Sequence, residues 1–218
     1  MIEALGPNLW RWTAPSPHWT PEKGAGSDAW EQDVGCVLYA RDGTATLVDP
    51  LVAGDEDALW AFLDERTAGA RVLVALTAPW HRRSAGDVAA RYGAEVWIHR
   101  AGLARLAVAG ARAFDGDGAI APGVEALVPA GVAEGETAYW LPEHGVLVAR
   151  EVFQGTADGL RYGVSPAAAD RDALHAWLHG LDRLPVRLVL PTHGPPAPDG
   201  RAAIRAALAR PPYGACSA

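Results

Sequence analysis

Three consecutive residues, His81, Arg82 and Arg83, follow Trp80 in a short polar loop of this 218-residue chain. An apolar run at 71–76 precedes the loop, and a helical pattern that begins near Ser84 follows it. In α/β proteins ligands bind at the carboxyl ends of strands, so this junction is the first candidate for a functional site. A guanidinium is permanently charged and donates in a planar fork, and a helix N-terminus attracts anions. The loop therefore predicts a binding site for a small anion.

Other combinations of reactive side chains are weaker evidence for a functional site. His175 and His179 lie four residues apart within a helical pattern, so they share one face and could chelate a metal ion. No third ligand is near them in the sequence, which favours a solvated pair. The acidic string FDGDG at 114–118 is a turn, because a calcium loop needs more oxygen ligands at fixed spacing. The sequence contains no GxSxG elbow, Walker loop or dinucleotide fingerprint.

Composition limits the classes of function. The net charge of −7 argues against a nucleic-acid or anionic-membrane partner, because both need a basic face. The two cysteines, Cys36 and Cys216, have no CxxC partners that would suggest a thiolate metal site. We find no signal peptide and no apolar run of the roughly 18 to 20 residues that a membrane span needs. These features predict a cytoplasmic protein whose partner is a small molecule. A protein partner stays open, and the sequence does not give the oligomeric state.

Short apolar strands alternate with helical patterns, which favours sheets covered by helices. No linker or repeat divides the chain, so we expect one domain over residues 1–218. Ser84 with Asp87 three residues later resembles a capping box. Residues 1–33 are expected to give edge strands and a long loop. Strands are expected at 35–40, 44–49, 71–76, 95–99, 124–128, 137–141, 146–149 and 187–190, and helices at 55–66, 84–92, 102–108, 165–181 and 201–208.

Three strings and the threonine at position 77, in this order and spacing, give the chain a resemblance to the metallo-β-lactamase-fold superfamily. TATLVDPL at 44–51 resembles the early strand that ends in an aspartate, and Thr77 stands where the family's T-H-x-H-x-D-H loop begins. GETAYWLPEHGVLVARE at 135–151 resembles the hairpin that ends at the bridging aspartate. LVLPTHGPP at 188–196 resembles the last strand and its histidine. The resemblance implies an αββα four-layer sandwich of the α/β class.

The resemblance also implies where the metal ligands of such a protein would fall. Glu151 replaces the bridging aspartate, and His193 alone matches in kind. The other five positions carry side chains that cannot ligate zinc, which needs nitrogen, sulfur or carboxylate donors. Those five positions are Ala78, Trp80, Arg82, Arg83 and Val132. The dinuclear water-activating chemistry of the family therefore has no ligand set here.

We interpret the chain as a metal-free member of this fold, without a cofactor, that binds a small anion or is a non-catalytic homologue. One of Arg82 and Arg83 is expected to replace the metal as the positive element and to pair with Glu151. The ligand-binding set is then Trp80, His81, Arg82, Arg83, Glu151 and His193, with His18 and Trp19 at the cleft mouth.

Two alternatives stay open. In the first, a divergent hydrolase of an ester, thioester or lactone holds one zinc ion on His81, Glu151 and His193. In the second, the chain is an interaction or regulatory module that binds a partner protein.

Overall fold

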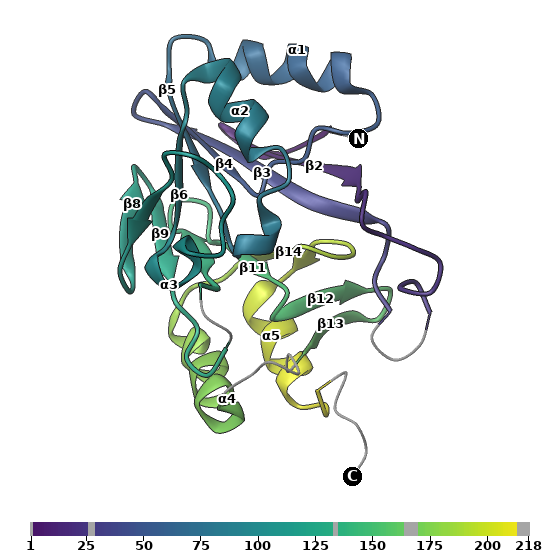
Figure 1. Cartoon of the computed structure of the whole chain (residues 1–218). Helices are drawn as coiled ribbons and strands as arrows, with labels where there is room; N and C mark the ends of the chain where they lie inside the picture. Colours follow the sequence, from purple (N-terminus) through teal and green to yellow (C-terminus); the bar gives the residue numbers. More distant parts are fainter. Residues whose placement is uncertain (1, 26–28, 133–134, 164–169, 213–218) are drawn as a thin grey trace.

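A computed structural model describes residues 2–25, 29–132, 135–163 and 170–212 of the chain. Two large sheets stack face to face, with helices on both outer sides (Figure 1). Among the described residues no helix is long and apolar enough to cross a membrane.

The first sheet has seven strands in sequence order, β1 to β7. Strands β1 to β4 pair antiparallel, and β4 to β7 pair parallel. Every residue of β4 is buried, as expected for a parallel strand that is covered on both faces. The strands are β1 (Ile2–Gly6), β2 (Leu9–Pro15), β3 (Asp33–Arg41), β4 (Thr44–Val48), β5 (Arg71–Ala75), β6 (Glu95–His99) and β7 (Arg112–Phe114).

The second sheet has the order β15-β14-β11-β10-β9-β8, and a separate hairpin is formed by β12 and β13. Only β11 and β14 pair parallel among the described strands of this sheet. Its strands are β8 (Gly118–Ala121), β9 (Val124–Leu127), β10 (Ala138–Leu141), β11 (Val146–Arg150), β14 (Leu188–Pro191) and β15 (Ala197–Pro198), and the hairpin is β12 (Phe153–Thr156) and β13 (Gly159–Tyr162).

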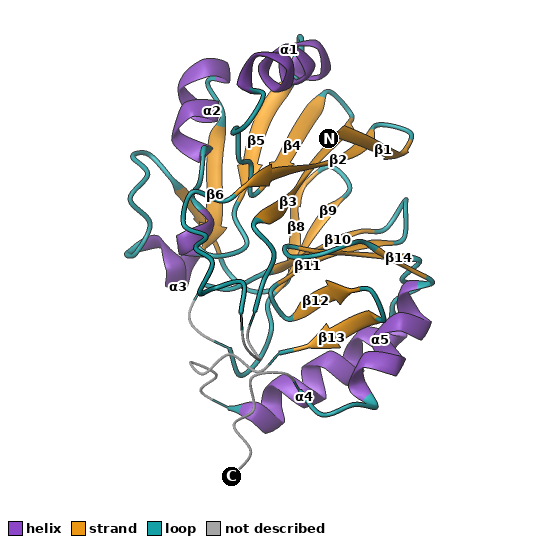
Figure 2. Ribbon diagram, turned by 90° about the vertical axis from the view of Figure 1, so that its right-hand side faces the viewer, coloured by secondary structure: helices purple, strands orange, loops and turns teal. Residues whose placement is uncertain are grey.

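The helices complete four layers, αββα, as expected (Figure 2). Helices α1 and α2 lie on the first sheet, and α4 and α5 lie on the side of the second sheet (Figure 2). Three clusters of buried apolar residues fill the three interfaces between these layers. The helices are α1 (Glu56–Thr67), α2 (Ala85–Tyr92), α3 (Arg100–Leu103), α4 (Arg171–Gly180) and α5 (Gly200–Leu208), with short 3₁₀ turns η1 (Pro79–His81) and η2 (Leu181–Arg183).

The structure corrects several local predictions. The helix expected at 102–108 is the four-residue α3. Ser84 precedes α2 but does not cap it, because its hydroxyl accepts a hydrogen bond from the backbone of Val52 (3.0 Å). The helix expected from Ser165 is described from Arg171 onward, and residues 164–169 lie outside the described ranges. Strands β7, β8, β12, β13 and β15 were not predicted, since each has at most four residues and weak alternation.

Candidate functional site

The candidate site lies where strands of both sheets end. Asp49 directly follows β4, and Thr77 follows β5, its parallel neighbour in the first sheet. Glu151 directly follows β11, and His193 follows β14, its parallel neighbour in the second sheet. Because parallel strands end at the same edge, each sheet brings its two residues together. The stacking of the sheets then joins the two pairs.

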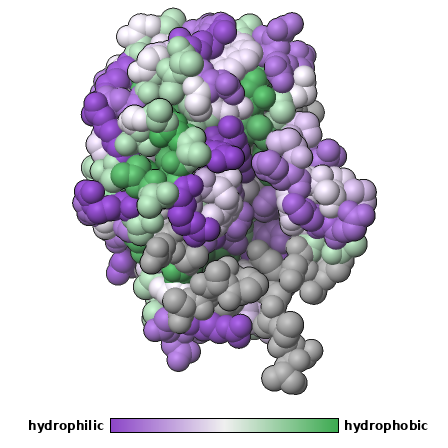
Figure 3. Space-filling model, viewed as in Figure 1, coloured by the Kyte–Doolittle hydropathy of each residue, from purple (hydrophilic) through white to green (hydrophobic). Residues whose placement is uncertain are grey.

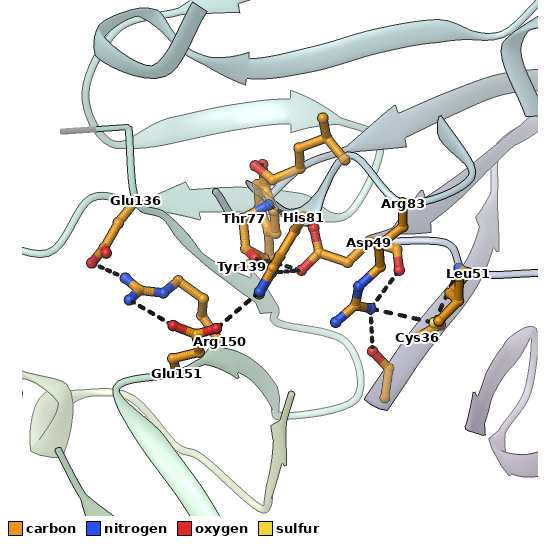
Figure 4. Close-up of polar contacts among 12 residues, drawn as sticks. Cys36, Asp49, Leu51, Thr77, His81, Arg83, Glu136, Tyr139, Arg150 and Glu151 are labelled. Atoms are coloured by element: carbon orange, nitrogen blue, oxygen red, sulfur yellow. Dashed lines mark hydrogen bonds and ion pairs between the residues drawn. The ribbon is translucent and has the colours of Figure 1, made fainter. Parts of the chain in front are cut away.

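His81 is the centre of this cluster. The turn η1 carries its ring inward, where the side chain is only 6% exposed. Nδ1 lies 2.8 Å from Asp49 Oδ2, and Nε2 lies 3.0 Å from Glu151 Oε1 (Figure 4). Each ring nitrogen therefore faces a carboxylate oxygen, and only the doubly protonated imidazolium can donate to both.

The pKa values of the three groups agree with this assignment. Burial alone would lower the pKa of His81, but the negative charge and hydrogen bond of Asp49 raise it above its ordinary value. Burial would raise the pKa of Asp49 and of Glu151, but their positively charged partners hold the pKa of both carboxyls below the ordinary range. An imidazolium between two carboxylates is the consistent charge state.

Asp49 is fixed by a second set of bonds. Its Oδ1 accepts the backbone N–H of Thr77 (2.9 Å), and its Oδ2 accepts the Thr77 hydroxyl. The same hydroxyl oxygen lies 2.8 Å from His81 Nδ1. Thr77 thus holds both the carboxylate and the ring, and all three side chains are buried.

A second cation, Arg150, lies beside Glu151. Its guanidinium is 3% exposed, pairs with the buried carboxylate of Glu136, and has Nη2 3.7 Å from Glu151 Oε2. In Figure 4 these residues continue the row that starts at Asp49 and His81. Burial of Glu136 outweighs the attraction of Arg150 and raises the pKa of this carboxyl to about 7.

Two further cations, Arg83 and Arg82, contribute to the site. Arg83 Nη1 donates to the backbone oxygens of Gly35 (3.0 Å) and Asp49 (2.8 Å). Arg82 is exposed. Within the described ranges neither arginine forms an ion pair. The charge of Arg82 is therefore available to an incoming anion, whereas Arg83 faces backbone oxygens and helps to lower the pKa of the Asp49 carboxyl.

Three non-glycine residues of the site have left-handed backbones: Asp49 (φ 47°), Arg83 (φ 37°) and Arg150 (φ 54°). Aspartate tolerates this region, but an arginine there costs of the order of 1 kcal/mol or more. Such strain persists only where the surrounding contacts fix it, and it is concentrated at functional sites. Here it turns both arginine side chains toward the cluster.

A cavity of about 760 Å³ opens onto these residues. Cationic side chains, among them Arg82, Arg83 and Arg150, contribute to its wall. Trp80, 41% exposed, lies near the guanidiniums of Arg150 and Arg105, which are 5.9 and 5.6 Å from its ring. The face in Figure 3 is hollowed near its centre, with hydrophobic and hydrophilic residues side by side. The apolar part of the wall is formed by Trp30, Val34, Leu51, Val132, Val152 and Leu174.

The residue types at this strand edge do not fit the two metal ions that the fold resemblance implies, because Ala78, Trp80, Arg82, Arg83 and Val132 carry no zinc-ligating atom. A ligand set must leave its donor atoms turned toward a common point. Three donor atoms remain close together: His81 Nε2 hydrogen-bonds directly to Glu151 Oε1, and His193 Nε2 lies 3.9 Å from that same oxygen. Among the described residues, no three histidine, cysteine, aspartate or glutamate side chains are arranged as a metal site.

The structure brings the six sequence-predicted residues together but assigns them different roles. Trp80, His81, Arg82, Arg83, Glu151 and His193 all line the one cavity. The expected ion pair between Glu151 and Arg82 or Arg83 is not formed among the described residues. The described partners of Glu151 are His81, Arg150 and His193. His193 packs against Trp30, with ring centroids 4.6 Å apart. His18 lines the cavity as expected, whereas Trp19 does not.

Four residues of the cluster were missed in the sequence: Asp49, Thr77, Glu136 and Arg150. Asp49 and Thr77 stood inside the family-like strings, and their position after two apolar strands was the available signal. Glu136 and Arg150 stood inside the string at 135–151, but nothing in it indicated their ion pair, because this pair joins β11 to the segment before β10.

Comparison with solved structures identifies the fold. The DIM-1 metallo-β-lactamase matches with a TM-score of 0.72 and 16% identity, over 96% of this chain and 95% of that one. A metallo-β-lactamase from Pontibacter korlensis matches with a TM-score of 0.69 and 15% identity, over 97% and 99%. A metallo-β-lactamase family protein from Thermus thermophilus matches with a TM-score of 0.66 and 20% identity, over 94% and 80%.

The chain therefore has the metallo-β-lactamase fold over nearly its whole length, as the sequence resemblance implied. No protein-family model and no curated protein sequence matches it. At these identities the likeness gives the fold and leaves the activity open.

Proposed function

We propose that the protein binds a small organic anion in the cavity at the strand ends without a metal ion, as a non-catalytic or metal-independent member of the fold. The observation that carries the proposal is the charge arrangement of this wall. His81 and Arg150 pair with buried carboxylates and Arg83 Nη1 donates to two backbone oxygens, whereas Arg82 has no carboxylate partner among the described residues. The cavity is thus left with one exposed guanidinium, that of Arg82, which can bind an anion.

The size and lining of the cavity indicate the class of ligand. A volume of about 760 Å³ is within the range of roughly 300–1,000 Å³ usual for small-molecule sites. Tryptophan, valine and leucine side chains accompany the arginines. A molecule with an apolar body and a carboxylate, sulfonate or phosphate group matches both parts of the wall.

The test is a thermal-shift screen on chelator-treated protein. Each organic anion is paired with its neutral amide or ester, so that the charge is the only variable. A ligand at 100 times its Kd stabilises by about 2.7 kcal/mol, which corresponds to a rise in Tm of roughly 5–11 °C for a chain of this size. We expect anions to raise Tm and their neutral analogues not to do so.

Two variants locate the binding. Arg82→Ala removes an exposed guanidinium of the cavity and is expected to reduce the shift. Arg210→Ala, which removes an exposed arginine outside it, is expected to leave the shift unchanged. A screen without any shift, or a shift that Arg82→Ala leaves intact, overturns the proposal. A shift or ester turnover that appears only with added zinc and is lost in His193→Ala favours the mononuclear hydrolase instead. Co-purification of a partner protein without a ligand shift favours the interaction module.

A further inference from the structure

His175 and His179 form a second cluster of ligating side chains, outside the cavity. Both belong to α4 and both are exposed. Their spacing of one helical turn puts them on the same face. Figures 1 and 2 show α4 in the outer helical layer. Leu174, which lines the cavity, is buried on a different face of the helix.

The two rings are turned toward each other. Nε2 of His175 and Nε2 of His179 lie 3.3 Å apart, and the ring planes are inclined by 67°. His175 also packs on Tyr162 of β13, with centroids 6.3 Å apart. This contact restrains the His175 ring, so less conformational freedom is lost when a ligand binds.

The separation of the two nitrogens is the one that a tetrahedral metal ion requires. Two imidazole nitrogens at about 2.0–2.1 Å from such an ion, with a tetrahedral angle between them, lie roughly 3.3–3.4 Å apart. The pair therefore has the nitrogen separation of a chelate, and the rings, whose centroids are 4.4 Å apart, need only turn so that both nitrogens face the ion. A single N–H···N hydrogen bond accounts for the same distance, and metal titration separates the two explanations.

We propose that His175 and His179 form a two-histidine site for a divalent transition-metal ion of the Zn²⁺, Ni²⁺ and Cu²⁺ class. Imidazole nitrogen is a preferred ligand for these ions, and Cu²⁺ is expected to bind most tightly among them. The described residues supply no third donor to this pair. The remaining coordination positions are thus open to water.

The test is a titration of the untagged full chain with Zn²⁺ and with Cu²⁺ in a non-coordinating buffer, followed by calorimetry. One ion per chain is expected to bind. His175→Ala and His179→Ala are each expected to weaken binding by about tenfold or more, because the chelate loses its second arm. Both side chains are exposed, so these variants should keep the wild-type Tm. For Cu²⁺, electron paramagnetic resonance should show nitrogen hyperfine structure from two imidazoles.

A matched control keeps the number of histidines and changes only their spacing. Ala176 is exposed on α4, so Ala176→His combined with His179→Ala gives neighbouring histidines that point about 100° apart. This variant should bind as weakly as His179→Ala alone. Equal affinity of the wild type and the spacing variant overturns the proposal. The absence of binding also overturns the proposal. Binding that is lost in His193→Ala and kept in His179→Ala overturns it as well, because that result would place the ion in the cavity.

Discussion

Replacement of Asp49 by asparagine tests whether a buried imidazolium holds the two sheets together at the site. The substitution preserves the shape of the side chain, and asparagine tolerates the left-handed backbone at this position. The amide oxygen can still accept the backbone N–H of Thr77. The negative charge next to His81 Nδ1 is lost.

The magnitude follows from burial. The side chains of Asp49 and His81 are 4% and 6% exposed, so water cannot replace the lost partner. Removal of one member of a buried ion pair costs about 3–5 kcal/mol. Glu151 still accepts from His81 Nε2, which places the expected loss at the lower end, about 3 kcal/mol. For a chain of this size that is a fall in Tm of roughly 6–12 °C.

The effect depends on pH with a defined sign. The pKa of Asp49 is lowered, so its contribution is present above its unfolded value and is lost as the pH falls through the folded one. The pKa of His81 is raised, so its contribution is complete below its unfolded value and is lost as the pH rises through the folded one. The penalty of Asp49→Asn should therefore be largest near about pH 6 and smaller near about pH 9.

The assay is urea unfolding of the wild type and of Asp49→Asn at both pH values, with the slope m checked for constancy. Asp158→Asn, on an exposed turn, is the control and is expected to stay within about 0.5 kcal/mol of the wild type. An Asp49→Asn variant as stable as this control at about pH 6 would refute the imidazolium assignment.

Three further predictions concern the Glu136–Arg150 pair and a close backbone approach at Gly155. Glu136 has a pKa of about 7 against an ordinary 4.5, so it stabilises the folded state at low pH and loses this contribution as the pH rises from 4.5 to 7. The difference in unfolding free energy between the wild type and Glu136→Gln should therefore change by about 3 kcal/mol across that pH range. A difference that does not change with pH would contradict the raised pKa of Glu136. Arg150→Met leaves that carboxylate buried without its cation, so it should cost about 3–5 kcal/mol at pH 8 and less at pH 5, as measured by urea unfolding. Gly155→Ala would place a methyl group against the backbone of Pro195 and should cost about 1–3 kcal/mol, whereas Gly180→Ala meets open space and should not lower Tm.

The fold was predictable because its determinants are local and repeated. The apolar runs that became β4, β5, β11 and β14 are short and bounded by polar residues, and their order agreed with a known arrangement. Short edge strands such as β7 and β15 have two or three residues and no such pattern. They exist because a neighbouring strand supplies their hydrogen bonds.

The sequence predicted where the site lies but not which of its side chains form ion pairs with one another. In the family's loop pattern the second histidine position falls on Trp80, one residue before His81. The turn η1 shortens that loop and brings His81 over Thr77, four residues earlier. Arg83 is turned instead to the backbone of Gly35 and Asp49. The cation that reaches Glu151 from β11 is Arg150, whose left-handed backbone is a product of tertiary packing.

The metal content of the purified protein tests the central claim most directly. The protein is produced without a tag in zinc-supplemented medium, in a His175→Ala, His179→Ala background that removes the proposed site on α4. The account predicts far less than one zinc per chain, with no change when His193→Ala is added. One or two zinc ions per chain that disappear with His193→Ala would contradict it.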